Sequence, residues 1–326
     1  MRLPQDLLES VQAEIDKVER RRLVQAAAQI SEHYQSGDIS SPAVTNEAQR
    51  AAYLAVRFPA TYAANRRVLS EINDRVPEAH ISSLLDLGAG PGTALFAASE
   101  QFPALQQATL LESDQHWLAL GKNLTGRSPH SAVSGAQWLR QDLRSGFACT
   151  PHDLVVISYV LGELASSAAE GVLRKAWGCA TKFMVVLEPG ARRGFAAIHA
   201  ARSLLIQIGA NILAPCPHHG SCPMAAAGDW CHFSQRLERT SQHRQLKGGA
   251  LGYEDEKFSY LVASRDSIAA AGSRIVRHPG IHSGYIQLDL CTPAASLEKR
   301  TVTRSHKEAY KQARKAEWGD AWKDSV

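Results

Sequence analysis

Three cysteines fall within a short stretch of a chain that holds six in all. Cys216, Cys222 and Cys231 are spaced C-x5-C-x8-C, and Cys291 offers a fourth sulfur at the end of a strand-like run. Thiolates that converge on a metal explain this clustering more simply than packing does. Zinc sites usually begin with closely spaced cysteine pairs, which this stretch lacks. Four loosely spaced thiolates therefore favour a 4Fe-4S cluster, and Cys-Pro steps at two of the cysteines are also found around such ligands.

Two alternatives stay open for this stretch. One is zinc with a histidine ligand taken from His218, His219 or His232. The other is a segment without metal. A bound metal would have a structural role, because it would order a polar loop and fix the basic side chains that follow. Those basic side chains are Arg236, Arg239, Arg244 and Lys247.

A glycine-rich loop is the second chemical signal. It reads LLDLGAGPGTA and contains Asp86, Gly88, Ala89, Gly90 and Gly92. Glycines let the backbone turn tightly and approach a ligand closely. The G-x-G-x-G spacing, with an acid two residues before the first glycine, resembles motif I of class I S-adenosylmethionine (SAM) methyltransferases. A doubly wound fold that binds another nucleotide is the alternative.

Two further acids stand where a SAM site needs them. Glu112 ends the next strand-like run, about 20 residues on, where an acid accepts hydrogen bonds from ribose hydroxyls. Asp142 ends the third run, at the position that reads the adenine amino group in the methyltransferases. The cofactor positions predicted are therefore Asp86, Gly88, Ala89, Gly90, Gly92, Glu112 and Asp142.

The catalytic residues stay unassigned. Enzymes that methylate base amino groups place Asp or Asn, Pro, Pro and an aromatic residue after the fourth strand, and this chain has Ile157-Ser158-Tyr159-Val160. Carbon-5 cytosine enzymes need a cysteine nucleophile there, and none is present. Tyr159 and Glu163 could line the pocket. A chain that binds SAM without catalysing methyl transfer is therefore a second interpretation.

The elements that must position these residues follow an alternating pattern. Short β-like runs at 82–88, 108–113, 137–142, 153–160 and 182–189 are separated by helical runs. This order predicts βαβ units and a parallel sheet covered on both faces. The fold class expected is α/β, of the Rossmann-like class I SAM-methyltransferase type, with a mixed, mainly parallel sheet, an N-terminal helical cap and a Cys-rich metal-binding insertion.

The same reading divides the chain into five parts. The predicted parts are an N-terminal helical region (1–80), a SAM-binding core (81–208), a Cys-rich insertion with its basic segment (209–255), the last strands of the core sheet (256–293) and a basic C-terminal tail (294–326). A loop is expected at 36–42, and a helix at 306–318 in the tail.

Composition excludes several classes of protein. With 44% hydrophobic and 21% charged residues, the chain is neither fibrous nor disordered. No apolar run is long enough to span a membrane. Residues 1–22 lack the apolar region of a secretory signal and carry several acids. We therefore expect a bacterial cytoplasmic location, where cysteines are reduced thiols or metal ligands.

Positive charge is concentrated in the last third. Residues 231–326 hold 16 Lys and Arg against 11 Asp and Glu, whereas the rest of the chain holds 20 against 21. Residues 299–315 in the tail are the most basic part, with seven cations against one acid, Glu308. These cations are Lys299, Arg300, Arg304, Lys307, Lys311, Arg314 and Lys315. Such residues bind nucleic-acid phosphates without reading sequence, so an RNA partner is expected here.

Several motifs together resemble one family. They are the glycine loop, CPH…CP…WCHF, R-x-x-R…H-x-x-x-K, GYEDEKFSYLVASR and the late LDLCTP. The combination resembles the methyltransferase-like family of mitochondrial small ribosomal subunit assembly factors and their bacterial relatives. The resemblance implies a SAM-binding domain, a 4Fe-4S site on Cys216, Cys222, Cys231 and Cys291, and binding to small-subunit rRNA or an assembly intermediate.

Three functions are consistent with these observations. The first is a SAM-binding, iron–sulfur, RNA-binding protein that methylates rRNA during ribosome assembly or translation. The second is a catalytically inactive assembly factor that keeps the methyltransferase fold. The third is a small-molecule methyltransferase, which the basic tail disfavours. Neither DNA nor a membrane is expected as a partner.

Overall fold

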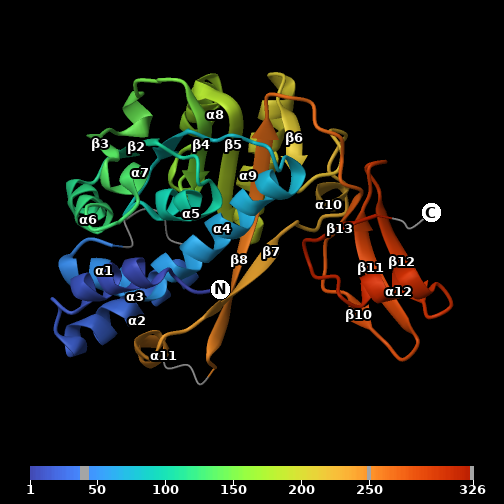
Figure 1. Ribbon diagram of the computed structural model, residues 1–326, viewed down its shortest axis with the longest axis horizontal. Coiled ribbons are helices and arrows are strands. Elements are labelled where there is room, and N and C mark those ends of the chain that lie inside the picture. Colours follow the sequence, from blue (N-terminus) through green and yellow to red (C-terminus); the bar gives the residue numbers. More distant parts are fainter. Residues whose placement is uncertain (37–43, 248–250, 324–326) are drawn as a thin grey trace.

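A central sheet with mainly parallel strands forms the core of the computed structural model, which describes residues 1–36, 44–247 and 251–323 (Figure 1). Its strand order is β3-β2-β1-β4-β5-β8-β6, and an eighth strand, β7, pairs with another part of β8. The strands are β1 (Ser83–Leu87), β2 (Gln107–Glu112), β3 (Gln137–Arg140), β4 (His152–Ser158), β5 (Ala180–Pro189), β6 (Asn211–Ala214), β7 (Phe233–Glu238) and β8 (Tyr253–Ser264).

The strand directions identify the fold. β1 to β5 run parallel to one another, and β8 is antiparallel to its neighbours β5, β6 and β7. The sequence order reverses at β1, so the ends of β1 and β4 border the crevice where doubly wound sheets bind ligands. The predicted fold class, a class I SAM-methyltransferase fold with a mixed, mainly parallel sheet, is confirmed.

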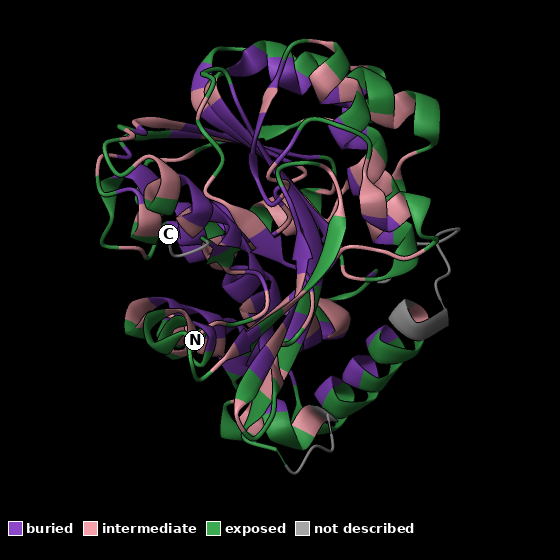
Figure 2. Ribbon diagram, turned by 90° about the vertical axis from the view of Figure 1, so that its right-hand side faces the viewer, coloured by how far each residue is buried: buried purple, intermediate pink, exposed green. Residues whose placement is uncertain are grey.

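Helices cover both faces of this sheet, and the strands between them are buried (Figure 2). On one face α4 packs on α5 and on β8, and on the other α8 and α9 pack on β4, β5 and β8. The helices of these two layers and the two short 3-10 turns near them are α4 (Phe58–Arg75), α5 (Thr93–Gln101), α6 (Gln115–Thr125), α7 (Ser131–Ser134), η1 (Leu143–Ser145), η2 (Leu161–Glu163), α8 (Ser166–Cys179) and α9 (Arg192–Gln207).

Three further helices form the start of the chain. They are α1 (Gln5–Ile15), α2 (Arg20–Ser36) and α3 (Glu47–Val56). Their apolar faces join the larger core cluster, through Leu7, Val11, Leu23 and Leu54 among others. The loop predicted at 36–42 lies, beyond Ser36, outside the described residues. Among the described residues, no helix is long and apolar enough to cross a membrane.

The C-terminal part forms a second sheet, which the sequence reading did not foresee. Its order is β10-β11-β9-β13, with β12 paired to β11. The elements are β9 (Ser273–Ile275), β10 (Gly280–Ile281), β11 (Tyr285–Cys291), β12 (Leu297–Thr303), α12 (Lys307–Ala313) and β13 (Ala321–Trp322). A separate core of Ile275, Ile286, Leu288, Leu290, Val302, Ala313 and Trp322 holds it together.

Two predicted boundaries are therefore corrected. Within 256–293 the core sheet receives β8, whereas β11 belongs to the second sheet. Residues 294–326 are not a simple tail, because 297–303 form a strand and the helix is limited to Lys307–Ala313. Alternation of apolar residues predicts a strand but does not say which sheet it joins, since that depends on distant pairing partners.

The Cys-rich segment contains structure of its own. Besides β6 and β7, which extend the core sheet, it forms α10 (Pro223–Ala226) and α11 (Ser241–Lys247). β7 and β8 make a long antiparallel hairpin that extends from the sheet toward α11 (Figure 1). Residues 248–250 at the end of this hairpin lie outside the described residues, as does the side chain of Lys247.

Candidate functional site

The glycine loop directly follows β1, in the middle of the central sheet. Gly88, Gly90 and Gly92 have φ values of 75°, 54° and 85°, a region that glycine adopts without steric cost. A side chain at Gly88 would meet Val160 Cγ2 at 2.5 Å, so this position is closed by packing. At Gly90 nothing lies within 4 Å of an added Cβ, so the backbone there is open to a ligand.

Glu112 holds the loop in place. One of its carboxylate oxygens accepts a hydrogen bond from Gly90 N at 2.8 Å, and the other accepts from Asp114 N at 2.8 Å. The amides of Gly88 and Ala89 both donate to the carbonyl of Leu111, the residue before Glu112. The end of β2 therefore fixes the loop through three backbone N–H groups, those of Gly88, Ala89 and Gly90, which explains how the two motifs are brought together.

Asp86 is the unusual group of this site. It is buried at the end of β1, and its Oδ2 has no hydrogen-bond partner among the described residues. Burial, with a smaller contribution from the nearby Glu112 charge, raises the pKa of Asp86 to about 7. A buried carboxyl oxygen without a partner is costly, so this position favours a ligand that donates a hydrogen bond or carries positive charge.

Asp142 lies at the edge of the same end of the sheet. Its carboxylate caps η1 by accepting from Arg144 N at 2.9 Å, and it pairs with the Arg144 guanidinium at 2.8 Å. That hydrogen bond lowers the pKa of Asp142. A wide polar hollow of about 750 Å³ borders it, lined by residues at and after the ends of β2 and β3, including Asp114, His116 and Arg140. Asp142, which the sequence predicts to contact the adenine, thus already has a partner, and its role in binding stays a prediction.

The segment after β4 contains an internal network in place of a catalytic motif. Tyr159 has a φ of 61°, which a non-glycine residue rarely adopts. Its hydroxyl donates to Glu256 Oε1 at 3.2 Å, and Arg57 binds both oxygens of Glu256 at 3.0 and 3.1 Å. Burial raises the pKa of Tyr159 well above its usual value, so the phenol stays protonated. Sequence reasoning named Tyr159 but missed its two partners.

Glu188 and Glu163 complete the acidic surroundings of this crevice. Glu188, at the end of β5, is buried and accepts from Leu161 N at 2.7 Å. Burial raises the pKa of Glu188 to about 7 and also raises that of Glu163. The charge of Glu112 contributes to the raised pKa of Glu163, and the charge of Glu163 contributes to that of Glu188, so the three acids lie near one another. That Glu163 lines the pocket stays a prediction.

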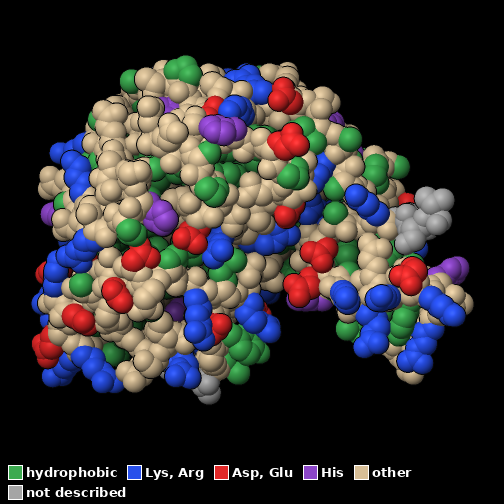
Figure 3. Space-filling view, viewed as in Figure 1, with side chains coloured by type: hydrophobic (Ala, Val, Ile, Leu, Met, Phe, Trp, Pro, Cys, Tyr) green, Lys and Arg blue, Asp and Glu red, His purple; other side chains and the backbone are tan. Residues whose placement is uncertain are grey.

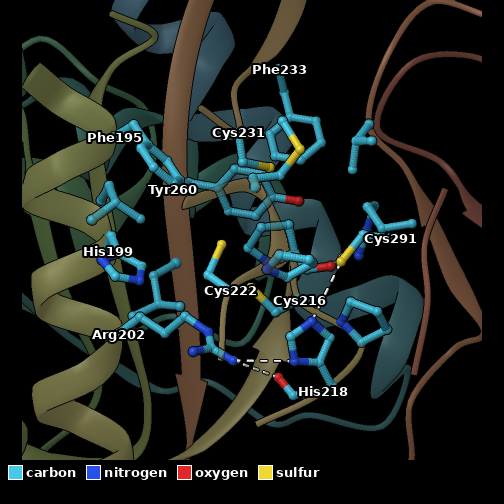
Figure 4. Close-up of a pocket in the computed structure, with 18 residues that line it drawn as sticks. Phe195, His199, Arg202, Cys216, His218, Cys222, Cys231, Phe233, Tyr260 and Cys291 are labelled. Carbon is cyan, nitrogen blue, oxygen red and sulfur yellow. Dashed lines mark hydrogen bonds between the residues drawn. The ribbon is translucent and has the colours of Figure 1, made fainter. Parts of the chain in front are cut away.

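The four cysteines of the predicted metal site line one cavity (Figure 4). Cys216 follows β6, Cys222 precedes α10, Cys231 precedes β7 and Cys291 ends β11. The cavity has a volume of about 40 Å³, more than the roughly 10–15 Å³ that one water molecule needs. Its sulfurs come from both sheets, so a ligand bound by all of them would join the core to the C-terminal sheet.

Three of the four thiols in this cavity are in an environment that favours the protonated form. Burial, together with the neighbouring sulfurs, raises the pKa of Cys291 to about 12 and that of Cys231 well above its usual value. Burial also raises the pKa of Cys216, which Arg202 opposes. Within the described ranges, no three His, Cys, Asp or Glu side chains already form a group that could hold a metal ion.

The remaining two cysteines depart from the expectation of reduced thiols. Cys149 and Cys179 form a disulfide, with Cα atoms 5.6 Å apart. Cys179 ends α8 and Cys149 lies in the exposed stretch before β4. Their separation of 30 residues gave no sign of this proximity, which results from α8 packing beside β4.

The basic residues predicted to bind RNA fall into two groups. On the β7–β8 hairpin, Arg236 pairs with Asp255 at 2.8 Å and Arg239 with Glu254 at 2.7 Å. Arg244, on α11, is exposed.

In the C-terminal sheet Arg300 pairs with Glu298 at 3.3 Å. Six other cations there are exposed and form no ion pair with a described residue, and Lys and Arg gather on this lobe in Figure 3. They are Lys299, Arg304, Lys307, Lys311, Arg314 and Lys315.

Comparison with known proteins gives a family match over most of the chain. A family model described as "Mitochondrial small ribosomal subunit Rsm22" matches residues 47–323. The chain is 26% identical to the human "Ribosome assembly protein METTL17, mitochondrial", covering 82% of this chain and 61% of that protein. It is 25% identical to "Rsm22-cox11 tandem protein 2, mitochondrial" of Schizosaccharomyces pombe, covering 82% and 42%. The chain thus spans less than two thirds of the length of these relatives.

These names contradict one prediction. The family and the relatives are mitochondrial, so the predicted bacterial cytoplasmic location is wrong. That prediction was based on the composition of residues 1–22, and the composition of one short segment does not determine a compartment.

Solved structures similar to this one are methyltransferases. One is magnesium protoporphyrin IX methyltransferase from Synechocystis PCC 6803 with bound SAM, which is 12% identical with a TM-score of 0.42, covering 76% of this chain and 98% of that one. Another is the plantazolicin methyltransferase BpumL in complex with a triazolic desmethylPZN analog and SAH, 12% identical with a TM-score of 0.40, covering 79% of this chain and 99% of that one. The fold assignment rests on the strand order and directions described above.

Proposed function

The chain belongs to the Rsm22 family of the mitochondrial small ribosomal subunit, and from this premise we propose that it is an assembly protein of the small ribosomal subunit. The family match over residues 47–323 is the observation that carries this proposal. The name of the human relative, which describes it as a ribosome assembly protein, supports it. The SAM, metal and RNA sites proposed below would serve this role.

We propose that the glycine loop binds SAM. The unpartnered Oδ2 of Asp86 supports this, because the ammonium group of the cofactor would satisfy a buried carboxyl. Gly90 leaves the loop backbone open to a ligand, and Glu112 and Asp142 would contact the ribose and the adenine. Bound SAM would supply a methyl group on a sulfonium.

A pair of glycine variants tests the SAM site. Gly90→Asp places a side chain in the open space of the loop, and Gly209→Asp does the same at a remote glycine with φ of 87° and equally open surroundings. Both bear a similar backbone cost, since Asp tolerates the left-handed region. In calorimetric titration we expect SAM binding by the wild type and Gly209→Asp, and at least 100-fold weaker binding by Gly90→Asp. Equal affinity in all three proteins, or no binding by the wild type, overturns the site.

Methylation of rRNA is the second candidate function, and the intact glycine loop favours it. The network after β4 argues for the non-catalytic role, because the Tyr159 hydroxyl is engaged with Glu256 and stays protonated. Transfer of tritiated methyl from SAM to small-subunit rRNA separates the two. Transfer that is lost in Gly90→Asp establishes the enzyme; SAM binding without transfer to rRNA or assembly intermediates supports the non-catalytic assembly protein.

We propose that the four cavity cysteines hold a 4Fe-4S cluster, with zinc as the alternative. The donor set fits, because four thiols from separate segments line one small cavity. A bound metal would take the place of the thiol protons and join the segments to each other, which is a structural role. Iron, acid-labile sulfide and zinc contents of anaerobically purified protein distinguish the cluster from zinc, and absence of metal refutes the site.

We propose that the C-terminal sheet with α12 binds rRNA. Six of its exposed cations, Arg300 not among them, form no ion pair with a described carboxylate, so they can neutralise phosphates without first breaking an ion pair. The N-terminal helices (1–80) and the core strands would then form the scaffold that presents this surface. Co-sedimentation of the full chain with small-subunit assembly intermediates tests the assembly role, and an absence of association contradicts it.

A further inference from the structure

Arg202 is a buried cation without a carboxylate partner in the described part of the chain. It lies on the inner side of α9 with 5% of its surface exposed, and it lines the cavity of the four cysteines. Arg274 lines the same cavity and is equally buried, but it binds both oxygens of Glu71 at 2.9 and 3.0 Å. Since an unpaired buried charge is costly, Arg202 indicates that something negative belongs in this cavity.

The contacts of Arg202 point at the segment that carries the cysteines. Its Nη2 donates to the carbonyls of His218 at 2.9 Å and Gly220 at 2.8 Å, and lies 3.5 Å from His218 Nδ1. Its Nε is buried without a partner. Arg202 therefore braces the loop between Cys216 and Cys222 from the helix side, and still has donor capacity left over.

His218 contacts both Arg202 and the sulfur of a cysteine. Its Nε2 lies 3.4 Å from Cys291 Sγ, and the ring is buried (Figure 4). Because guanidinium groups only donate, the contact with Arg202 makes Nδ1 the acceptor and places the ring proton on Nε2. The imidazole then donates to the sulfur of Cys291. The sequence had offered His218 as a zinc ligand, and the geometry gives it a different task.

We propose that Arg202 and His218 are positioning residues for the anionic, metal-bound form of the four-cysteine site: Arg202 supplies the compensating positive charge and fixes the His218 tautomer that donates a hydrogen bond to the Cys291 sulfur. This inference rests on the proposed metal site. His218 is then not a metal ligand, and the ligands are Cys216, Cys222, Cys231 and Cys291.

The proposal has two physical consequences. Hydrogen bonds to a ligand sulfur and nearby positive charge stabilise the metal-bound thiolate, and loss of such outer partners typically weakens metal binding by about 10–100-fold. In an iron–sulfur site they also favour the reduced state, because it carries one more negative charge. Removing either residue should therefore speed metal loss and lower the reduction potential of a bound cluster.

Four variants of the full chain test this relay. Arg202→Met removes the charge, His218→Leu removes the donor, and His218→Gln restores a donor at the same distance from the backbone. His219→Leu is the matched control, because His219 is in the same loop but its Nε2 accepts from Ile212 N at 2.9 Å, away from the cavity. Metal retention against a chelator and the reduction potential are measured under anaerobic conditions, with thermal unfolding as a check on folding.

We expect metal loss about 10–100-fold faster in Arg202→Met and His218→Leu, and near wild-type rates in His218→Gln and His219→Leu. The reduction potential of the cluster should be lower in the first two variants. A tenfold rise in the ratio of oxidised to reduced cluster at a fixed potential corresponds to a fall of about 59 mV. Metal retention and potential unchanged in His218→Leu would refute the relay while leaving the metal site intact. If Arg202→Met fails to fold, the Leu and Gln variants of His218, which have similar volumes, decide the question. A wild-type protein without metal refutes the proposed metal site itself, and the relay with it.

Discussion

The β7–β8 hairpin and the C-terminal sheet both carry rows of arginine and lysine, and those charges have different neighbours. On the hairpin, antiparallel register places Arg236 directly opposite Asp255, and Arg239 reaches Glu254. On the C-terminal sheet and α12, Lys307, Lys311 and their neighbours are exposed with no such partner in the described chain. The first set of charges stabilises the fold, and the second remains available to an anionic partner.

The difference shows that a count of basic residues does not identify a nucleic-acid interface. A phosphate that binds an ion-paired arginine must replace a carboxylate that is already in place, so the gain is small. A phosphate that binds an exposed, unpaired lysine releases counterions at no such cost. The region with fewer internal acids is therefore the better candidate, even though the sequence singled out both.

Charge reversal in the C-terminal region should have the largest effect. In Lys311→Glu with Arg314→Glu, we expect RNA affinity at least tenfold weaker and a salt slope reduced by about two, one for each lost phosphate contact. The matched control exchanges the hairpin pair, Arg236→Asp with Asp255→Arg, which keeps the ion pair and the net charge. Filter-binding titrations at several salt concentrations measure both, and equal losses in the two proteins would erase the distinction between the regions.

Removal of the more buried hairpin pair should act on stability and not on RNA. Arg239 and Glu254 are only 15% and 10% exposed in their side chains. Arg239→Gln should lower the free energy of unfolding by about 1–3 kcal/mol, the cost of losing hydrogen bonds to a largely buried charge. Urea unfolding gives the stability, and RNA affinity should stay within twofold of the wild type. A large loss of affinity in a stable variant would place Arg239 in the interface.

The exposed hairpin pair, Arg236 with Asp255, should make stability depend slightly on pH. The hydrogen bond from Arg236 is the main cause that lowers the pKa of Asp255 below its ordinary value, and the Arg236 charge adds to it. A carboxylate with a depressed pKa in the folded state contributes stability above its unfolded pKa of about 3.9, and that stability is lost as pH falls through the folded value. The difference in melting temperature between wild type and Asp255→Asn should therefore be present at pH 6 and vanish below about pH 3. A constant difference in melting temperature over this range would show that the ionisation of Asp255 does not account for the stability of the pair.

Local sequence patterns predicted much of the fold. The strand-like runs around Asp86, Glu112 and Val156 each became a strand of the central sheet, because a buried parallel strand needs a short continuous apolar run wherever it occurs. The helical runs between them were predicted for the same reason. The glycine loop was found because positive φ at Gly88, Gly90 and Gly92 restricts the residue type at each position.

What depends on distant pairing was not predicted. The second sheet contains β9, β11 and β13, which lie apart in the sequence. No local pattern shows that they belong to one sheet. The ion pairs of the hairpin depend on the register between β7 and β8.

One feature of the sequence could have identified Arg202 as a functional residue. It stands between Ile198 and Leu205 on the apolar side of α9, where a cation is out of place unless it has a task. The roles predicted for the cysteines as ligands and for the tail residues as RNA contacts stay predictions.

The most direct test of this account is ultraviolet crosslinking of the wild-type chain to small-subunit rRNA, with the crosslinked peptides identified by mass spectrometry. We expect crosslinks in residues 297–318, on β12 and α12, and few or none in residues 233–257 of the hairpin. Crosslinks confined to the hairpin would contradict the central claim that unpaired charge, and not the number of basic residues, marks the RNA-binding surface.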